Sequence, residues 1–364
     1  FALTLAATAG LYGVVPKGFF PLQDTGLVQV ITEAAQTTSF AAMAKRQQAL
    51  AEVIMKDPDV EHLASFIGVD GANPTLNTGR MQLTLKPFDQ RRSSAAEVIR
   101  RLAESTSHLP GITAYMQPVQ DLTIEDRVSK TQYQFLLSSP DASDLNSATL
   151  RLLERLKTLP QLVDVASDLQ DQGQQAYVEI DRAAASRLGV SVAAIDNALY
   201  NAYGQRLIST IFTQSNQYRV VLEVDPAWRT HPRNLGQLYI PATTGAQIPL
   251  AAVARIVERP ASLVVNHVAQ FPSATISFNT APGVALGQAV AVIKAEEADL
   301  GLPASVETSF QGAALAFEAS LANTLWLILA AVVTMYIVLG VLYESTIHPV
   351  TILSTLPSAA LGAL

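Results

Sequence analysis

Cysteine is absent from the 364-residue sequence, and charged residues make up only 15% of it. Without cysteine the chain has no thiol nucleophile and no cysteine-ligated zinc cluster. Basic residues are also scarce: 24 Lys and Arg stand against 31 Asp and Glu, a formal net charge of −7. The sequence also lacks any basic stretch interleaved with aromatic residues, and both features disfavour a nucleic-acid partner.

Motifs for nucleotide binding and hydrolysis are missing as well. None of the seven lysines follows a glycine, which excludes a P-loop, and no histidine precedes a glutamate, which excludes an HExxH zinc site. The G-x-S-x-G motif of serine hydrolases is absent. The five histidines are scattered without metal-ligand spacing. We therefore predict a protein that is not an enzyme and uses no cofactor or metal.

A long uncharged segment is present near the C-terminal end. Residues 319–343 contain no charged side chain, and this run exceeds the roughly 20 apolar residues that cross a bilayer. We predict a transmembrane helix, whose small residues Ala330, Ala331 and Gly340 allow neighbouring helices to approach closely. Glu344 follows the run, where we expect a membrane-boundary role, with participation in gating as the alternative.

Both ends of the chain are also apolar. Residues 1–16 are typical of the end of a transmembrane helix; a signal peptide is the alternative, but a basic n-region and a cleavage site are missing before Lys17. Residues 347–364 are typical of the start of another span, with a buried core helix as the alternative. The mean hydropathy of +0.25 agrees with this interpretation. We predict an internal fragment of a longer polytopic membrane protein.

The region between the apolar segments begins with a pattern of strands and helices. Residues 27–34 alternate apolar and polar side chains, as a half-buried strand does. Ser94 and Glu97 form a capping box that opens a helix reaching about residue 108. Another helix, at 40–57, places its apolar residues on one face: Phe40, Met43, Leu50, Val53 and Ile54. Further strands are predicted at 60–69, 81–87 and 111–117. The order β-α-β-β-α-β is the ferredoxin-like split βαβ arrangement.

A second unit of the same kind is interrupted. A strand at 132–138, a helix at 141–158 and a strand at 162–167 form its first half. The buried face of that helix is predicted to carry Leu145, Ala148, Leu152 and Leu156. The second half follows about 100 residues later, as a strand at 276–280, a helix at 284–298 and a strand at 305–312. We therefore predict an inserted domain at about 171–265, with its own strands and a helix that starts at Ser191. Such an insertion is tolerated when its ends lie close together.

Several long segments resemble one family of transporters. FFPLQDTG (19–26), DRAAASRLGVSVAAIDNAL (181–199) and LYES followed by HP (342–349) are similar to the resistance-nodulation-division (RND) proton-driven efflux transporters. The resemblance spans the whole chain and covers the second half of such a transporter. Three further segments are similar to the B-type (MdtB/MuxB-like) subunit of heteromeric multidrug pumps: GVDGANPTLNTGR (68–80), QDLTIEDRVSKTQYQF (120–135) and NAYGQRLISTIFTQSNQYRVVLE (201–223).

The resemblance implies an α+β periplasmic porter, made of tandem ferredoxin-like units with an inserted docking subdomain, joined to partial all-α transmembrane segments. The implied boundaries are 1–16 for the end of a seventh transmembrane helix, 19–120 for the first porter subdomain, 121–170 with 266–312 for the second, 171–265 for the docking subdomain, 319–343 for an eighth transmembrane helix and 347–364 for the start of a ninth.

The resemblance also implies a location and partners. The protein would lie in the bacterial inner membrane, with its large domain in the periplasm, and would form a trimer with sister RND subunits. A periplasmic membrane-fusion adaptor would connect it to an outer-membrane channel. Its cargo would be amphipathic drugs or bile-salt-like compounds, driven by proton influx. The family's proton-relay residues lie on helices outside this sequence.

Substrate contact is expected in the cleft between the two porter units. By alignment with the family, a glycine-edged switch loop falls at Gly68, Val69, Asp70, Gly71 and Ala72; a simple turn is the alternative. Phe66 is the aromatic residue near this loop. The strand facing the same cleft carries Tyr115, Met116 and Gln117 where homomeric pumps carry phenylalanines. This difference favours drug binding by a partner subunit.

Two further sites are predicted. Arg127 and Lys130 are placed near the cleft entrance, where they would attract anionic detergents; a solvated loop is the alternative. The hairpin tip Thr213, Gln214, Ser215 and Asn216 is polar and uncharged, which suits docking to another chain, and a plain exposed hairpin would look the same.

Two other functions compete with multidrug efflux. One is a periplasmic scaffold of an envelope complex without its own substrate. The other is a transporter of lipids or metal ions. Metal export predicts clusters of methionine or carboxylate in the cleft, and Met81 and Met116 are isolated in the sequence, so this alternative is disfavoured.

Overall fold

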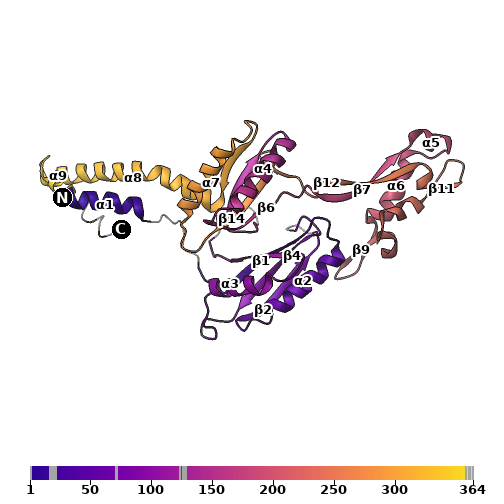
Figure 1. Cartoon of the computed structure of the whole chain (residues 1–364), viewed down its shortest axis with the longest axis horizontal. Coiled ribbons are helices and arrows are strands. Elements are labelled where there is room, and N and C mark those ends of the chain that lie inside the picture. Colours follow the sequence, from indigo (N-terminus) through magenta and orange to yellow (C-terminus); the bar gives the residue numbers. More distant parts are fainter. Residues whose placement is uncertain are drawn as a thin grey trace. The chain divides into compact units, whose positions relative to one another are not determined.

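The computed structural model (Figure 1) describes residues 2–15, 23–69, 73–122, 124, 129–356, 359 and 362. The chain divides into two compact units. Unit 1 comprises Phe1–Gln170 and Val264–Leu364, and unit 2 is the intervening Asp171–Leu263. Each is described by itself below.

The first half of unit 1 is a βαββαβ fold, called here the first porter-like lobe. Its elements are β1 (Leu27–Ala34), α2 (Phe40–Ile54), β2 (Val60–Ile67), β3 (Thr78–Leu85), α3 (Ala95–Thr106) and β4 (Ile112–Pro118). The strands form one antiparallel sheet in the order β2-β3-β1-β4. Every second residue of β1 is buried. These residues share a core with α2 and α3, which cover one face of the sheet. The opposite face, which these helices do not cover, is called here the open face.

Helix α2 differs from its predicted burial at one end. Met43, Leu50 and Ile54 are in the core as expected, but Phe40 is 49% exposed. The Phe40 ring lies near Gly68 instead. A Cβ atom added at Gly68 would meet this ring at 3.4 Å. The buried place on the helix face is taken by Gln47, which accepts a hydrogen bond from Thr32 at 2.6 Å.

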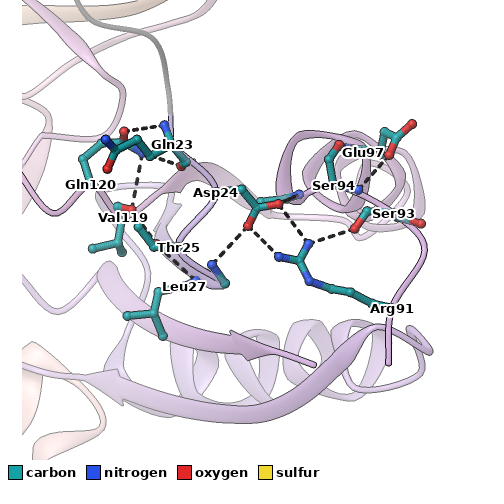
Figure 2. Close-up of polar contacts among 12 residues, drawn as sticks. Gln23, Asp24, Thr25, Leu27, Arg91, Ser93, Ser94, Glu97, Val119 and Gln120 are labelled. Carbon is teal, nitrogen blue, oxygen red and sulfur yellow. Dashed lines mark hydrogen bonds and ion pairs between the residues drawn. The ribbon is translucent and has the colours of Figure 1, made fainter. Parts of the chain in front are cut away.

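The predicted capping box of α3 is confirmed. The Ser94 hydroxyl accepts from the Glu97 N–H, and the Glu97 carboxylate accepts from the Ser94 N–H at 2.7 Å (Figure 2). This reciprocal pair satisfies N–H groups that a helix start otherwise leaves without partners. The helix ends at Thr106, two residues before the predicted end.

The second half of unit 1 repeats the fold and is called the second porter-like lobe. It contains β5 (Tyr133–Ser138), α4 (Ala142–Lys157), β6 (Leu162–Ser167), β14 (Phe271–Thr280), α7 (Leu286–Leu300) and β15 (Glu307–Gln311), with the short β13 (Asn266–Val268) at one edge. Helices α4 and α7 cover one face of its sheet (Figure 1). Three phenylalanines, Phe135, Phe278 and Phe310, fill the centre of the core. The four α4 residues predicted to be buried are buried.

Three helices carry the apolar segments. They are α1 (Ala2–Val14), α8 (Gly312–Tyr343) and α9 (His348–Leu353). Helix α8 starts directly after β15, and Ala314 and Phe317 in its first turns belong to the core of the second porter-like lobe. Among the described residues, one segment is long and apolar enough to cross a membrane, Trp326–Tyr343, and none of it is buried.

Unit 2 is a small α+β insert. It contains β7 (Gly173–Ile180), α5 (Arg182–Arg187), α6 (Val192–Tyr203), β8 (Arg206–Phe212), β9 (Gln217–Leu222), β10 (Tyr239–Pro241), β11 (Gln247–Pro249) and β12 (Ala254–Ala261), with short 3-10 turns between them. Its strands form three two-stranded ribbons, β7 with β12, β8 with β9 and β10 with β11. The ends of the insert meet, because Gln170 and Val264 pair in an antiparallel bridge. The predicted fold class, α+β with tandem ferredoxin-like units, an insert and partial all-α transmembrane segments, is confirmed.

Candidate functional site

The open face of the first sheet carries one row of side chains from all four strands. Phe66, Arg80, Ile31 and Tyr115 are register partners across β2, β3, β1 and β4. The guanidinium of Arg80 lies over the Phe66 ring at 5.7 Å. Since the helices cover the opposite face, this row faces away from the lobe's own core.

Met116 is a correction to the predicted cleft residues. Successive residues of a strand point to opposite faces, so Tyr115 and Gln117 share the open face while Met116 points to the other. Met116 is 6% exposed and belongs to the helix-covered core of the lobe. Gln117 donates a hydrogen bond from its amide to the Ser129 carbonyl at 3.2 Å.

A cavity of about 130 Å³ lies where the two porter-like lobes of unit 1 meet. The first lobe lines it with Ile31, Thr78 and Arg80, among others, and the second with Lys130, Asp168 and Asn266, among others. Most of the lining residues are polar, but most of the surface that they present to the cavity is apolar. The cavity therefore suits a small amphipathic group that makes apolar contacts and a few hydrogen bonds.

Lys130 joins the two lobes beside this cavity. Its ammonium group donates to the Glu33 carboxylate of β1 and to the Ser167 carbonyl of β6, both at 2.7 Å. The Tyr115 ring lies 5.8 Å from the same ammonium. The Lys130 side chain is 11% exposed, so this lysine lines the cavity as a paired cation. Its predicted partner at the cleft entrance, Arg127, lies outside the described residues.

Two acidic groups near the cavity have shifted proton affinities. Burial raises the pKa of Asp168 above its ordinary value, against the opposing hydrogen bonds from Thr275 and the charge of Lys130. Asp168 accepts from the Thr275 N–H at 2.6 Å and from the Asn266 amide at 2.9 Å. Burial, with the carboxylates of Glu33 and Asp164, also raises the pKa of Tyr115. The Tyr115 hydroxyl is therefore neutral at physiological pH and can act as a hydrogen-bond donor.

The predicted switch loop is described only at its start. Gly68 has φ of +96°, a conformation that favours glycine, and Val69 is 66% exposed. Asp70, Gly71 and Ala72 lie outside the described residues. The exposed Val69 lies two residues after the end of β2, whose Phe66 belongs to the open-face row.

The predicted docking tip is a tight turn between β8 and β9. Thr213 donates from its backbone and from its hydroxyl to the Asn216 carbonyl, both at 2.8 Å. These bonds close the turn and leave Gln214 and Ser215 at its exposed end. The two strands below the tip are β-branched and aromatic, as the sequence indicates, and they expose large apolar side chains: Leu207, Ile208, Ile211, Phe212, Tyr218 and Val221.

Glu344 ends helix α8 in a left-handed conformation, with φ of 47°. Its N–H donates to the Gly340 carbonyl, and its side chain is exposed. This geometry turns the chain toward α9, four residues further on. The gating role considered for Glu344 stays a prediction.

The two ferredoxin-like lobes with their insert resemble the periplasmic porter domain of RND transporters. A sequence model of the AcrB/AcrD/AcrF family matches residues 1–364. The chain therefore belongs to the AcrB/AcrD/AcrF family of RND efflux transporters.

Solved structures share this fold. Two crystal forms of a heavy metal efflux pump, forms II and I, superpose with TM-scores of 0.87 and 0.86, each at 21% sequence identity. In both cases the match covers 99% of this chain and 38% of the pump. The chain thus spans less than half the length of these pumps, and at this identity the likeness concerns the fold alone.

Proposed function

We propose that the chain is part of a B-type subunit of a proton-driven multidrug efflux pump, which exports amphipathic drugs or bile-salt-like compounds by alternating access. The proposal rests mainly on the cavity, which lies between two lobes that are formed by different parts of the chain. Opening and closing of such a cleft changes access to the cavity without any chemical step. The proton relay is assigned to helices beyond this sequence.

The roles proposed for the parts of the chain rest on membership of the family. The two porter-like lobes act as the moving porter subdomains, and unit 2 acts as the docking subdomain that contacts a membrane-fusion adaptor and, through it, an outer-membrane channel. The subunit assembles as a trimer with sister subunits in the inner membrane. Because Lys130 is already paired with Glu33, attraction of anionic cargo falls to Arg127 rather than to Lys130.

The proposal is tested by a substitution that fills the cavity with a larger side chain. Ile31→Trp in the full-length transporter, expressed with its partners in an efflux-deficient strain, is expected to lower tolerance to detergents and antibiotics. The matched control is Leu150→Trp, on the exposed face of α4 with Leu150 41% exposed, which is expected to keep wild-type tolerance. A proton ionophore is expected to stop dye efflux. If deletion of the whole gene leaves tolerance unchanged while the partners are expressed, the protein is a scaffold instead.

A further inference from the structure

An exposed aromatic residue stands in the loop between β3 and α3. Phe88 is 65% exposed, yet its ring packs on the guanidinium of Arg91, 4.2 Å from the ring centre. The Arg91 side chain itself is 1% exposed. A large apolar side chain is thus held in place from below while most of its surface remains uncovered.

Arg91 is fixed by the segment that leads into β1, residues 23–26, called here the lead-in segment. Its guanidinium donates to both oxygens of Asp24, at 3.0 and 2.6 Å, and to the Ser93 carbonyl at 2.8 Å (Figure 2). Asp24 also accepts from the N–H of Ala95, the first residue of α3, at 2.7 Å. The position of the Phe88 ring is therefore tied to the lead-in segment through a single side chain.

A second exposed apolar residue follows another loop that is bound to the lead-in segment. The Gln120 amide exchanges two hydrogen bonds with the backbone of Gln23, at 2.8 and 3.0 Å. Leu122, two residues further on, is 69% exposed. The lead-in segment is thus bound to two loops, and each loop carries an exposed large apolar side chain.

The lead-in segment is close to lipid along the chain. Lys17 is the first charged residue after the apolar N-terminal segment, and six residue steps separate it from Gln23. Even a fully extended segment of that length spans at most about 20 Å. The residues bound to Gln23 and Asp24 therefore lie within reach of the point where the chain leaves the hydrocarbon.

The chemistry of the β3–α3 loop suits a lipid surface. Phe88 is flanked in sequence by Lys86 and Arg92, and Asp89 is the acidic residue of the same loop. Basic side chains attract phospholipid phosphates, and aromatic rings settle at the boundary between headgroups and acyl chains. Here the basic side chains can contact the phosphates, and the exposed ring can lie at the boundary between headgroups and acyl chains.

We propose that residues 86–92, with Leu122, rest on the periplasmic surface of the inner-membrane lipid, with the Phe88 ring inserted at the level of the headgroups. The inference rests on the membrane placement in the proposed function. Asp24 and Arg91 then connect this lipid contact to the start of both β1 and α3. The first porter-like lobe is thereby supported at the membrane independently of α1.

The test measures lipid contact at single positions in the full-length transporter, free of other cysteines and reconstituted into nanodiscs of phosphatidylethanolamine and phosphatidylglycerol. Phe88→Cys, Phe212→Cys and Leu327→Cys are each labelled with a nitroxide. The accessibility of each label to oxygen is compared with its accessibility to a water-soluble nickel chelate. Phe212, 75% exposed in unit 2, is the aqueous control, and Leu327, 67% exposed in α8, is the lipid control.

The label at position 88 is expected to favour oxygen over the nickel chelate, between the two controls. The lipid contact is overturned if the label at 88 is as accessible to nickel as the label at 212, or if a neighbouring subunit shields it from both reagents. In either case, a lipid-exposed label at 327 leaves the proposed function intact. An aqueous signal at 327 as well overturns both. Because Phe88 is exposed, its substitution leaves the core intact, and Phe88→Trp is expected to retain activity that Phe88→Asp reduces.

Discussion

At the residue scale, the cleft contains charged side chains that are shielded from bulk water and paired with each other. Lys130 and Glu33 are 97 positions apart in the sequence, and their pairing depends on how the two sheets face each other. No local pattern announces such a pair. The sequence could mark Lys130 as a cleft residue through family resemblance, but its pairing needed the three-dimensional structure.

Asp168 gives a prediction on pH dependence. Its raised pKa means that the folded protein binds this proton more tightly than the unfolded chain does, so stability decreases as pH rises through the folded-state pKa. Asp168→Asn removes this ionisation. The thermal unfolding midpoint of the variant, relative to wild type, is therefore expected to be higher at pH 7.5 than at pH 3.5, which lies below the ordinary pKa of an aspartate.

The measurement is differential scanning of the full-length protein in detergent at both pH values. Asp196→Asn, at an exposed position on α6, serves as the control and is expected to change little between them. An Asp168→Asn difference that is the same at both pH values would contradict the assigned burial of the carboxyl group.

At the scale of elements, alternation and helical periodicity predicted most strands and helices, but two local failures are instructive. Met116 was placed in the cleft together with both of its neighbours, although a strand cannot point three consecutive residues to one face. No alternation marks a strand at 254–261, where the structure has β12, because its sequence, ARIVERPA, carries Arg255, Glu258, Arg259 and Pro260. In a two-stranded ribbon with little burial, alternation has no core face to reveal it.

Helix α8 supports a prediction at the same scale. Phe317 is 3% exposed in the core of the second porter-like lobe, whereas Leu315, two residues earlier, is 47% exposed. Phe317→Ala is expected to destabilise that lobe by about 3 kcal/mol, because removing a buried ring leaves a cavity. Leu315→Ala is expected to cost much less. Limited proteolysis of the full-length protein, followed by mass spectrometry of the released fragments, compares the two, and equal sensitivity would argue against the packing of this turn.

At the scale of the whole molecule, the insert can be separated from the fold that carries it. Gln170 and Val264 face each other in an antiparallel bridge, an arrangement in which α-carbons are roughly 5 Å apart. A short glycine-containing turn can therefore replace residues 171–263. The shortened protein is expected to insert and fold, since the two hydrophobic clusters that the described residues of unit 1 form contain no residue of the insert.

The proposed docking role of unit 2 predicts that the same variant loses association with a membrane-fusion adaptor and, with it, drug tolerance. Expression level, detergent-resistant folding and chemical cross-linking to the adaptor provide the three readouts. A shortened protein that still cross-links to the adaptor would remove the docking assignment from unit 2, and one that fails to fold would show that the insert supports the porter-like lobes.

The unbroken course of α8 has a mechanical consequence. Its 32 residues make a rod about 48 Å long at 1.5 Å per residue, whereas the hydrocarbon layer is about 30 Å thick. The rod is therefore longer than that layer by roughly a third of its own length, and its N-terminal end is packed among Ala314, Phe317 and their neighbours in the second lobe. Because α8 is one continuous helix, a shift of its apolar part along the helix axis would also move the core residues of the second lobe that belong to its first turns.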